Sequence, residues 1–183
     1  MSRRFTRDPL ANPDALIRRV YAYAAYRLGH GPDAEDVTSE VFERALRYRE
    51  SYDRSKGEPV GWLLGIAHRC TSAALAARAA EQPAAELPHE TDGRTVEEES
   101  IRRLTVAAAV AQLGERDQEL ISLRYGADLT AAQMARILEL ETNAVEVALH
   151  RALGRLRSII ENEETSFAES AGVRRSVGRM NTL

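Results

Sequence analysis

Cysteine and aromatic residues are scarce in this chain of 183 residues. Cys70 is the single cysteine, so the chain cannot form an internal disulfide or a zinc site built from cysteine ligands. Aromatic residues make up 5% of the sequence, and β-branched runs are rare. Alanine, leucine, arginine and glutamate dominate instead, and these residues lose little side-chain freedom in a helix. The composition therefore predicts an all-α protein.

Long apolar runs and a strong excess of one charge are also missing. No window approaches the roughly 20 apolar residues that a membrane-spanning helix needs, and no apolar segment follows the basic N-terminus. We therefore expect a cytoplasmic protein without membrane insertion. The net charge of -3 at pH 7 argues against nucleic-acid binding held by charge alone. Any contact with DNA must be local or assisted by a partner.

The motifs of common enzymes are absent as well. The sequence has no glycine-rich phosphate loop, no His-Glu-x-x-His motif and no nucleophile elbow. His68 and Cys70 are two residues apart on a predicted helix, where they point to different sides. We interpret them as a histidine on the helix surface and a half-buried thiol. We predict that the protein is not an enzyme and has no catalytic residue, cofactor or metal.

Acidic residues are concentrated in one segment, residues 79–101, which holds seven of them against Arg94 alone. The segment has almost no large apolar residues, so it cannot bury enough surface to offset the entropy of ordering. It predicts an acidic flexible linker between two small helical domains. With a tail that we expect to be flexible, the predicted division is 1–78, 79–101, 102–160 and 161–183.

Three helices are predicted in the first domain. One begins at Asn12-Pro13-Asp14 and ends at Gly29, because Asn is a favourable N-cap and Pro fits the first helical position. A second begins at Asp33, and a third runs from Val60 to about Arg78. Their periodicity predicts inward faces that include Ile17 in the first helix and Leu46 in the second.

The second domain carries a helix-turn-helix pattern. Helices are predicted over residues 101–113 and 115–125, the latter stopped by Gly126 at the position after the helix. Thr130 is suited to cap a short helix over residues 131–138. After a turn at residues 139–141, Thr142 or Asn143 caps a longer helix with apolar residues in register.

Four segments in order carry a family resemblance, although the helix-turn-helix alone would also fit a plain helical bundle. They are Asp33–Leu46, Gly61–Ala67, Leu113–Tyr125 and Leu149–Arg157. Over about residues 10–158 the chain resembles bacterial RNA polymerase sigma factors of the extracytoplasmic-function (ECF) group. The resemblance implies a subunit that binds the clamp and flap of core RNA polymerase and recognises the -10 and -35 elements of promoter DNA. It also implies an anti-sigma factor as a partner, which no residue identifies.

The resemblance assigns roles to three helices. Polymerase contacts are expected at Asp36, Glu40, Glu43 and Arg44. Contacts near the -10 element are expected at Trp62, Arg69 and Arg78. Contacts near the -35 element are expected at Thr142, Asn143, Glu146, His150, Arg151 and Arg155.

The chain departs from the family pattern at both promoter-reading helices. Few polar groups follow Ile66-Ala67, and Glu146 stands in a run where the family commonly has Lys. Glu139 replaces the usual turn glycine, where a left-handed backbone would cost about 1 kcal/mol, which favours a different turn. One alternative is a sigma-like protein that binds polymerase or a regulator without reading DNA. Another, a free-standing helix-turn-helix repressor, leaves the match over residues 33–46 unexplained.

Overall fold

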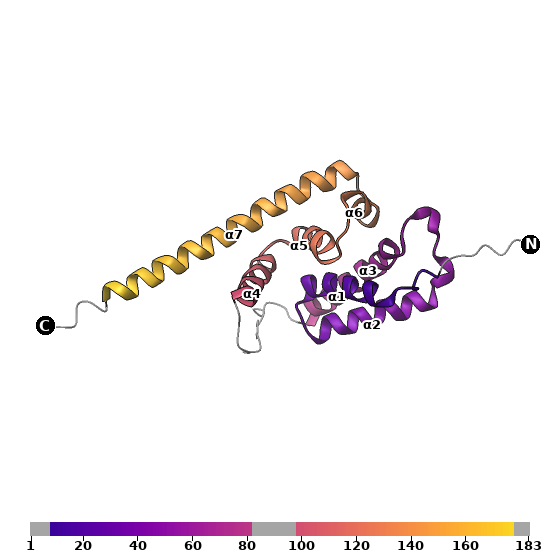
Figure 1. Cartoon of the computed structure of the whole chain (residues 1–183), viewed down its shortest axis with the longest axis horizontal. Coiled ribbons are helices and arrows are strands. Elements are labelled where there is room, and N and C mark those ends of the chain that lie inside the picture. Colours follow the sequence, from indigo (N-terminus) through magenta and orange to yellow (C-terminus); the bar gives the residue numbers. More distant parts are fainter. Residues whose placement is uncertain (1–7, 82–97, 178–183) are drawn as a thin grey trace, which may run out of the picture.

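The computed structural model describes residues 8–81 and 98–177, and every regular element in these ranges is helical (Figure 1). We call α1 to α3 the first lobe and α4 to α7 the second lobe. The first lobe consists of α1 (Pro13–Leu28), α2 (Pro32–Arg47), two short 3-10 turns, η1 (Arg49–Ser51) and η2 (Arg54–Lys56), and α3 (Pro59–Glu81). The second consists of α4 (Glu98–Ala111), α5 (Glu115–Ile121), the π-helical turn η3 (Ser122–Gly126), α6 (Ala131–Leu138) and α7 (Thr142–Val177).

The first two helices begin and end within a residue or two of their predicted positions. Pro13 opens α1, and Gly29 follows it with φ of 89°, although the Asn12 side chain makes no capping hydrogen bond. Two residues expected to face inward do not, since Ile17 is 42% and Leu46 is 58% exposed. Ile17 lies one turn before the buried stripe of α1 begins, and Leu46 lies beside the stripe of α2 that ends at Ala45.

The helix-turn-helix is present as predicted over α6 and the start of α7. Thr130 and Gln133 form a reciprocal capping box, in which the Gln133 backbone N–H donates to Thr130 Oγ1 (3.3 Å) and the Thr130 N–H donates to Gln133 Oε1 (2.9 Å). Because α7 begins at Thr142, the residue before it is Glu141, and neither Thr142 nor Asn143 occupies the N-cap position. The helix continues to Val177, so residues 161–177 are helical.

The turn of the helix-turn-helix keeps a left-handed residue although that residue is not glycine. Glu139 has φ of 55° and ψ of 43°, so the expectation of a different turn was wrong. The N–H groups of Glu139 and Leu140 both donate to the carbonyl of Ala135, Leu140 at 2.9 Å. These bonds satisfy the end of α6 and offset the strain at Glu139.

Gly126 serves a different purpose from the one predicted. It lies inside η3 rather than after a helix, and its backbone is not left-handed. A Cβ atom at this position would lie 3.0 Å from Cδ2 of Tyr26 and 3.1 Å from the carbonyl oxygen of Ala22. Glycine is needed here because η3 packs directly against the backbone of α1.

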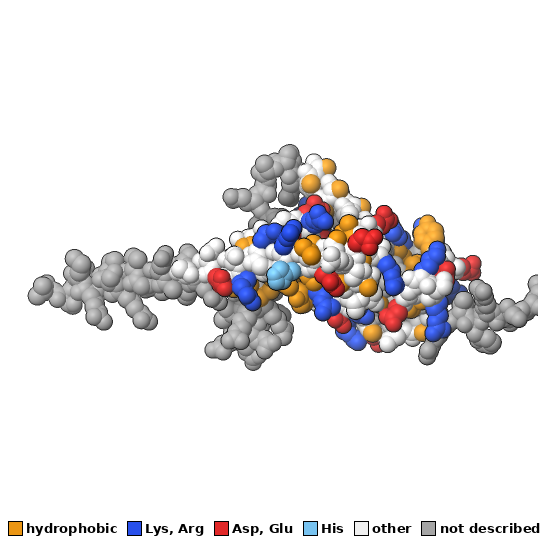
Figure 2. All heavy atoms as spheres, turned by 90° about the horizontal axis from the view of Figure 1, so that it is seen from above, with side chains coloured by type: hydrophobic (Ala, Val, Ile, Leu, Met, Phe, Trp, Pro, Cys, Tyr) orange, Lys and Arg blue, Asp and Glu red, His pale blue; other side chains and the backbone are white. Residues whose placement is uncertain are grey.

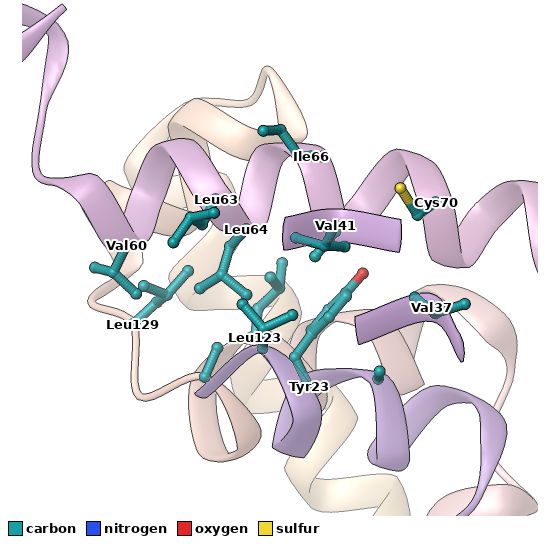
Figure 3. Close-up of a cluster of buried hydrophobic side chains, with 14 of the residues drawn as sticks. Tyr23, Val37, Val41, Val60, Leu63, Leu64, Ile66, Cys70, Leu123 and Leu129 are labelled. Atoms are coloured by element: carbon teal, nitrogen blue, oxygen red, sulfur yellow. The ribbon is translucent and has the colours of Figure 1, made fainter. Parts of the chain in front are cut away.

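The two lobes share one hydrophobic core. Leu123 and Leu129 of the second lobe lie among Tyr23, Val60 and Leu64 of the first, as Figure 3 shows. The second lobe also has a small cluster of its own, which consists of Val110, Leu113, Ile121 and Ala152. Most of the predicted acidic linker lies outside the described residues, and its first and last residues belong to α3 and α4. The division into domains therefore stays a prediction.

Candidate polymerase and DNA interfaces

The candidate polymerase contacts lie on the side of α2 away from its buried stripe. Asp36 and Glu43 are exposed, whereas Glu40 and Arg44 are half-buried. Arg44 Nη2 donates to Glu40 Oε1 at 2.5 Å, one helical turn apart. The four residues thus form a mixed-charge strip that a partner of complementary charge could bind.

Two apolar side chains extend this strip at the C-terminal end of α2. Leu46 is 58% and Tyr48 is 55% exposed. Leu46 was predicted to face inward, and no prediction was made for Tyr48. The sequence signals for this exposure are the position of Leu46 beside the apolar period that ends at Ala45 and the position of Tyr48 after the last residue of α2. Large apolar side chains next to charged ones are typical of protein interfaces.

The candidate -10 contacts are spread along α3 rather than gathered in one patch. Trp62 is half-buried, and its ring lies 5.6 Å from that of Tyr52 with a tilt of 56°. Arg69 is exposed, and Arg78 Nη1 lies 3.8 Å from Asp33 Oδ2 at the start of α2. From Trp62 to Arg78 the helix rises about 24 Å, so these residues could follow an extended strand but not share one base.

The candidate -35 contacts form an exposed polar face on the first turns of α7. Thr142, Asn143, Glu146 and His150 are all exposed, Val145 between them is buried, and Arg151 is exposed beside them. Figure 2, which looks down on the side where α7 lies, shows Arg and His side chains interspersed with acidic and apolar ones. This mixture suits selective contacts better than a uniform attraction to phosphate.

The sixth candidate on α7, Arg155, is held by the second lobe itself. Its Nε donates to Asp117 Oδ2 at 2.5 Å and its Nη2 donates to Asp117 Oδ1 at 2.7 Å. These hydrogen bonds raise the pKa of Arg155 above its ordinary value. Both bonds fix α7 against α5, so in this conformation the guanidinium holds α7 in place. The partners are 38 positions apart in the sequence, which explains why no local pattern pointed to the pair.

A buried polar cluster between the lobes was not predicted. Glu119 of α5 accepts a hydrogen bond from the Tyr23 hydroxyl at 2.8 Å, and its Oε1 lies 3.0 Å from Nδ1 of His68. Nε of Arg27 lies 2.9 Å from Oε2 of Glu119, in an ion pair whose N–H is not aligned for a hydrogen bond. Burial first, and then the charge of Glu119, raise the pKa of Tyr23 well above its ordinary value, so Tyr23 remains a hydrogen-bond donor. We call Tyr23, Arg27, His68 and Glu119 the Glu119 cluster.

Two further features near α3 are the buried Cys70 and an open cavity between the lobes. Cys70 is 1% exposed, more buried than expected, and burial raises the pKa of its thiol. An open cavity of about 390 Å³ lies beside the Glu119 cluster and is lined by both lobes, including Arg116 and Leu138. Among the described residues there is no cluster of three or more candidate metal ligands, and no described helix is long and apolar enough to cross a bilayer.

Comparison with known protein families gives the class that these two lobes define. Residues 14–80 match the family model of Sigma-70 region 2, and residues 103–156 match that of Sigma-70 region 4. The protein is thus a sigma factor, the class of RNA polymerase subunit that recognises promoters. More particularly, the chain belongs to the ECF RNA polymerase sigma factors.

Two relatives support this assignment, and one solved structure has a similar fold. The chain is 33% identical to the ECF sigma factor ShbA of Streptomyces griseus over 171 residues, which cover 85% of this chain and 87% of ShbA. It is 29% identical to the ECF sigma factor BldN of Streptomyces coelicolor over 82% of this chain, but this match spans 59% of BldN. The fold resembles the sigma factor RpoE in its complex with the anti-sigma factor NepR from Bartonella quintana, with a TM-score of 0.68 at 16% identity over 80% of this chain and 92% of that one.

Proposed function

We propose that this chain is a non-catalytic initiation subunit that docks on core RNA polymerase through α2, reads the -10 element with α3 and reads the -35 element with the start of α7. The observation that carries the proposal is the capped helix-turn-helix, whose second helix exposes Asn143, Glu146 and His150 on one face. The presence of core polymerase, promoter DNA and this protein in one complex also implies a cytoplasmic location.

The decisive experiment is reconstitution of the full chain with core polymerase, followed by sequencing of the transcripts that it starts. Specific start sites would support the proposal. Polymerase binding without initiation would favour the alternative, a sigma-like protein that does not read DNA. One observation favours that alternative, because Arg155, one of the expected DNA contacts on α7, is already paired with Asp117.

The polymerase-binding face is tested by reversing its charges. Glu40→Arg combined with Glu43→Arg should abolish binding to core polymerase in a pull-down titration. Far-UV circular dichroism and melting should change little, because exposed helix charges contribute only about 0.3 to 0.5 kcal/mol each to folding. The matched control is Glu50→Arg combined with Glu58→Arg, which changes the net charge equally at exposed positions outside α2. Core binding that survives the first pair would remove this face from the proposal.

Glu146 tests whether the recognition helix reads bases. A carboxylate here accepts a hydrogen bond from the N4 amino group of a cytosine, or it merely repels phosphate. We favour cytosine recognition, because Glu146 lies between Asn143 and His150 on the exposed face. Glu146→Lys should then cost about 1 to 3 kcal/mol of discrimination in a selection from randomised -35 sequences by the reconstituted complex.

The control for Glu146 is Glu161→Lys, which adds the same charge at an exposed position farther along α7. It should leave the selected sequence unchanged. If Glu146→Lys strengthens binding to every sequence and the selected sequence does not change, the carboxylate repels phosphate and reads no base.

An anti-sigma factor is the further partner that we propose. Two solved structures of similar fold support it, since RpoE was solved with the anti-sigma factor NepR and CnrH with the cytosolic domain of CnrY. CnrH resembles this chain with a TM-score of 0.55 at 19% identity over 82% of each chain.

A further inference from the structure

The Glu119 cluster joins the two lobes through a single carboxylate. Glu119 projects from the second lobe, and its three partners all belong to the first lobe: Tyr23 and Arg27 on α1 and His68 on α3. Its side chain is 8% exposed and that of Arg27 is 2% exposed. Both charges are therefore withdrawn from water at the contact between the lobes.

A buried pair of this kind depends on both of its members. Each charge loses its hydration, and the loss is compensated only while the opposite charge is present. Arg27 Nη1 also donates to the carbonyl of Glu115 at 3.0 Å, but a neutral carbonyl cannot replace the negative charge of Glu119. If Glu119 loses its charge while the lobes stay in contact, the buried Arg27 keeps as its ion-pair partner Glu115, at 3.4 Å, whose side chain is 77% exposed. Separated lobes would instead expose Arg27 to water.

Besides the shared hydrophobic core, the other polar contacts between the lobes lie close to the surface. Arg19 donates from Nε to the carbonyl of Ala127 and from Nη2 to that of Asp128, each at 2.7 Å. Arg136 Nη1 on α6 donates to the carbonyl of Lys56 at 3.4 Å. Water can replace these hydrogen bonds when the lobes separate, so among the polar contacts between the lobes Glu119 is the one most sensitive to a single substitution.

The closed arrangement does not match the spacing of a promoter. Sites at -10 and -35 lie about 25 base pairs apart, which is about 85 Å along the duplex. Here α6 of the helix-turn-helix is hydrogen-bonded to Lys56, three residues before α3, and both lobes share one core (Figure 3). One compact body of this kind cannot contact both elements, so the lobes must separate on the promoter.

We propose that the Glu119 cluster is an intramolecular latch, which holds the free protein closed and opens when core polymerase binds the separated lobes. The proposal rests on the proposed function as a sigma factor. Since polymerase binds the open form, its apparent affinity is reduced by the fraction of molecules that are open. A variant with a broken latch therefore binds core polymerase more tightly than the wild type does.

The distance between the lobes provides a direct test. Fluorophores are attached at Glu50→Cys and Val147→Cys, two exposed positions on different lobes, and Cys70 is buried and stays unlabelled. Single-molecule energy transfer then gives the open and closed populations. Glu119→Gln keeps an acceptor for Tyr23 but leaves Arg27 with the exposed Glu115 as its ion-pair partner. It should raise the ratio of open to closed molecules about a hundredfold.

Two further variants separate the latch from a general loss of structure. Glu115→Gln is the matched control, because Glu115 lies on the same helix and its Oε1 lies 3.4 Å from Arg27 Nη2, but its side chain is 77% exposed. It should leave the closed population unchanged. Arg27→Met combined with Glu119→Gln removes both charges and should restore the closed distance, which an unfolded variant could not do.

The proposal fails if Glu119→Gln stays closed, if the double variant stays as open as the single one, or if wild type bound to core polymerase keeps the closed distance. Failure of the proposed function gives a different result. In that case the reconstituted wild type starts no specific transcript, while the energy-transfer populations of the free variants still report on the latch.

Discussion

Gly126 and Gly154 should respond in opposite directions to the same substitution. At Gly126 an added Cβ meets the carbonyl oxygen of Ala22 at 3.1 Å and Cδ2 of Tyr26 at 3.0 Å. The tyrosine ring can turn away, but the carbonyl is part of α1 and moves only with the helix. Overpacking against backbone costs about 1 to 3 kcal/mol, so Gly126→Ala should destabilise the protein by that amount.

Gly154 is the internal control. It lies within α7, and nothing stands within 4 Å of a Cβ built on it. Alanine there restricts the unfolded chain and introduces no contact, so Gly154→Ala should stabilise the protein by about 0.5 to 1 kcal/mol. The two variants should therefore differ by about 1.5 to 4 kcal/mol, which follows from these two ranges.

Urea unfolding followed by circular dichroism measures both variants against the wild type. A loss of 2 kcal/mol in Gly126→Ala should also lower the melting temperature by about 4 to 8 °C in a protein of this size. If Gly126→Ala is as stable as Gly154→Ala, then η3 does not approach α1 as closely as the structure indicates, and the contact between the lobes is looser.

Three further predictions concern the helix-turn-helix and the core. Thr130→Ala should lower the free energy of unfolding by about 1 kcal/mol in urea denaturation, because it removes half of the capping box. Thr130→Ser should retain most of the wild-type stability, because its hydroxyl can still accept the hydrogen bond. Glu139→Gly should raise the melting temperature, because it relieves up to about 1 kcal/mol of left-handed strain, and an unchanged or lower value would contradict the strain. Burial raises the Cys70 pKa above its ordinary value of 9.0, so the unfolded thiol ionises first. The free energy of unfolding should therefore fall as the pH rises past about 9. Urea denaturation at about pH 8 and about pH 10 should show a smaller fall in Cys70→Ala than in the wild type.

The helices and the helix-turn-helix could be predicted because their signals are local. Pro13, Thr130 and the apolar period of α6 each act within a turn or two of their own position. The burial of Leu46 was predicted wrongly because a wide apolar stripe leaves open which edge meets the core. Glu139 shows that hydrogen bonds around a turn can hold a residue in a conformation that its side chain disfavours.

The contact between the lobes could not be predicted from one sequence. Tyr23 and Glu119 are 96 residues apart, and His68 and Glu119 are 51 apart, so neither pair has a periodic or local signature. Arg27 follows the period of the buried stripe of α1, yet an arginine near a helix C-terminus is ordinarily interpreted as exposed. Its burial depends on a carboxylate supplied from the other lobe.

The length of α7 has a mechanical consequence for the recognition face. A helix of 36 residues is about 54 Å long, and the second lobe holds it through Ala152, Arg155 and a hydrogen bond from Gln112 Nε2 to Glu163 Oε1. Beyond Glu163 the helix extends past α4, as Figure 1 shows. Because an uninterrupted helix is stiff, it acts as a lever, in which a tilt of its first turns, the proposed DNA-reading end, is amplified at Val177. A probe near Val177 would report rotations of the first turns of α7 that are too small to resolve at those turns.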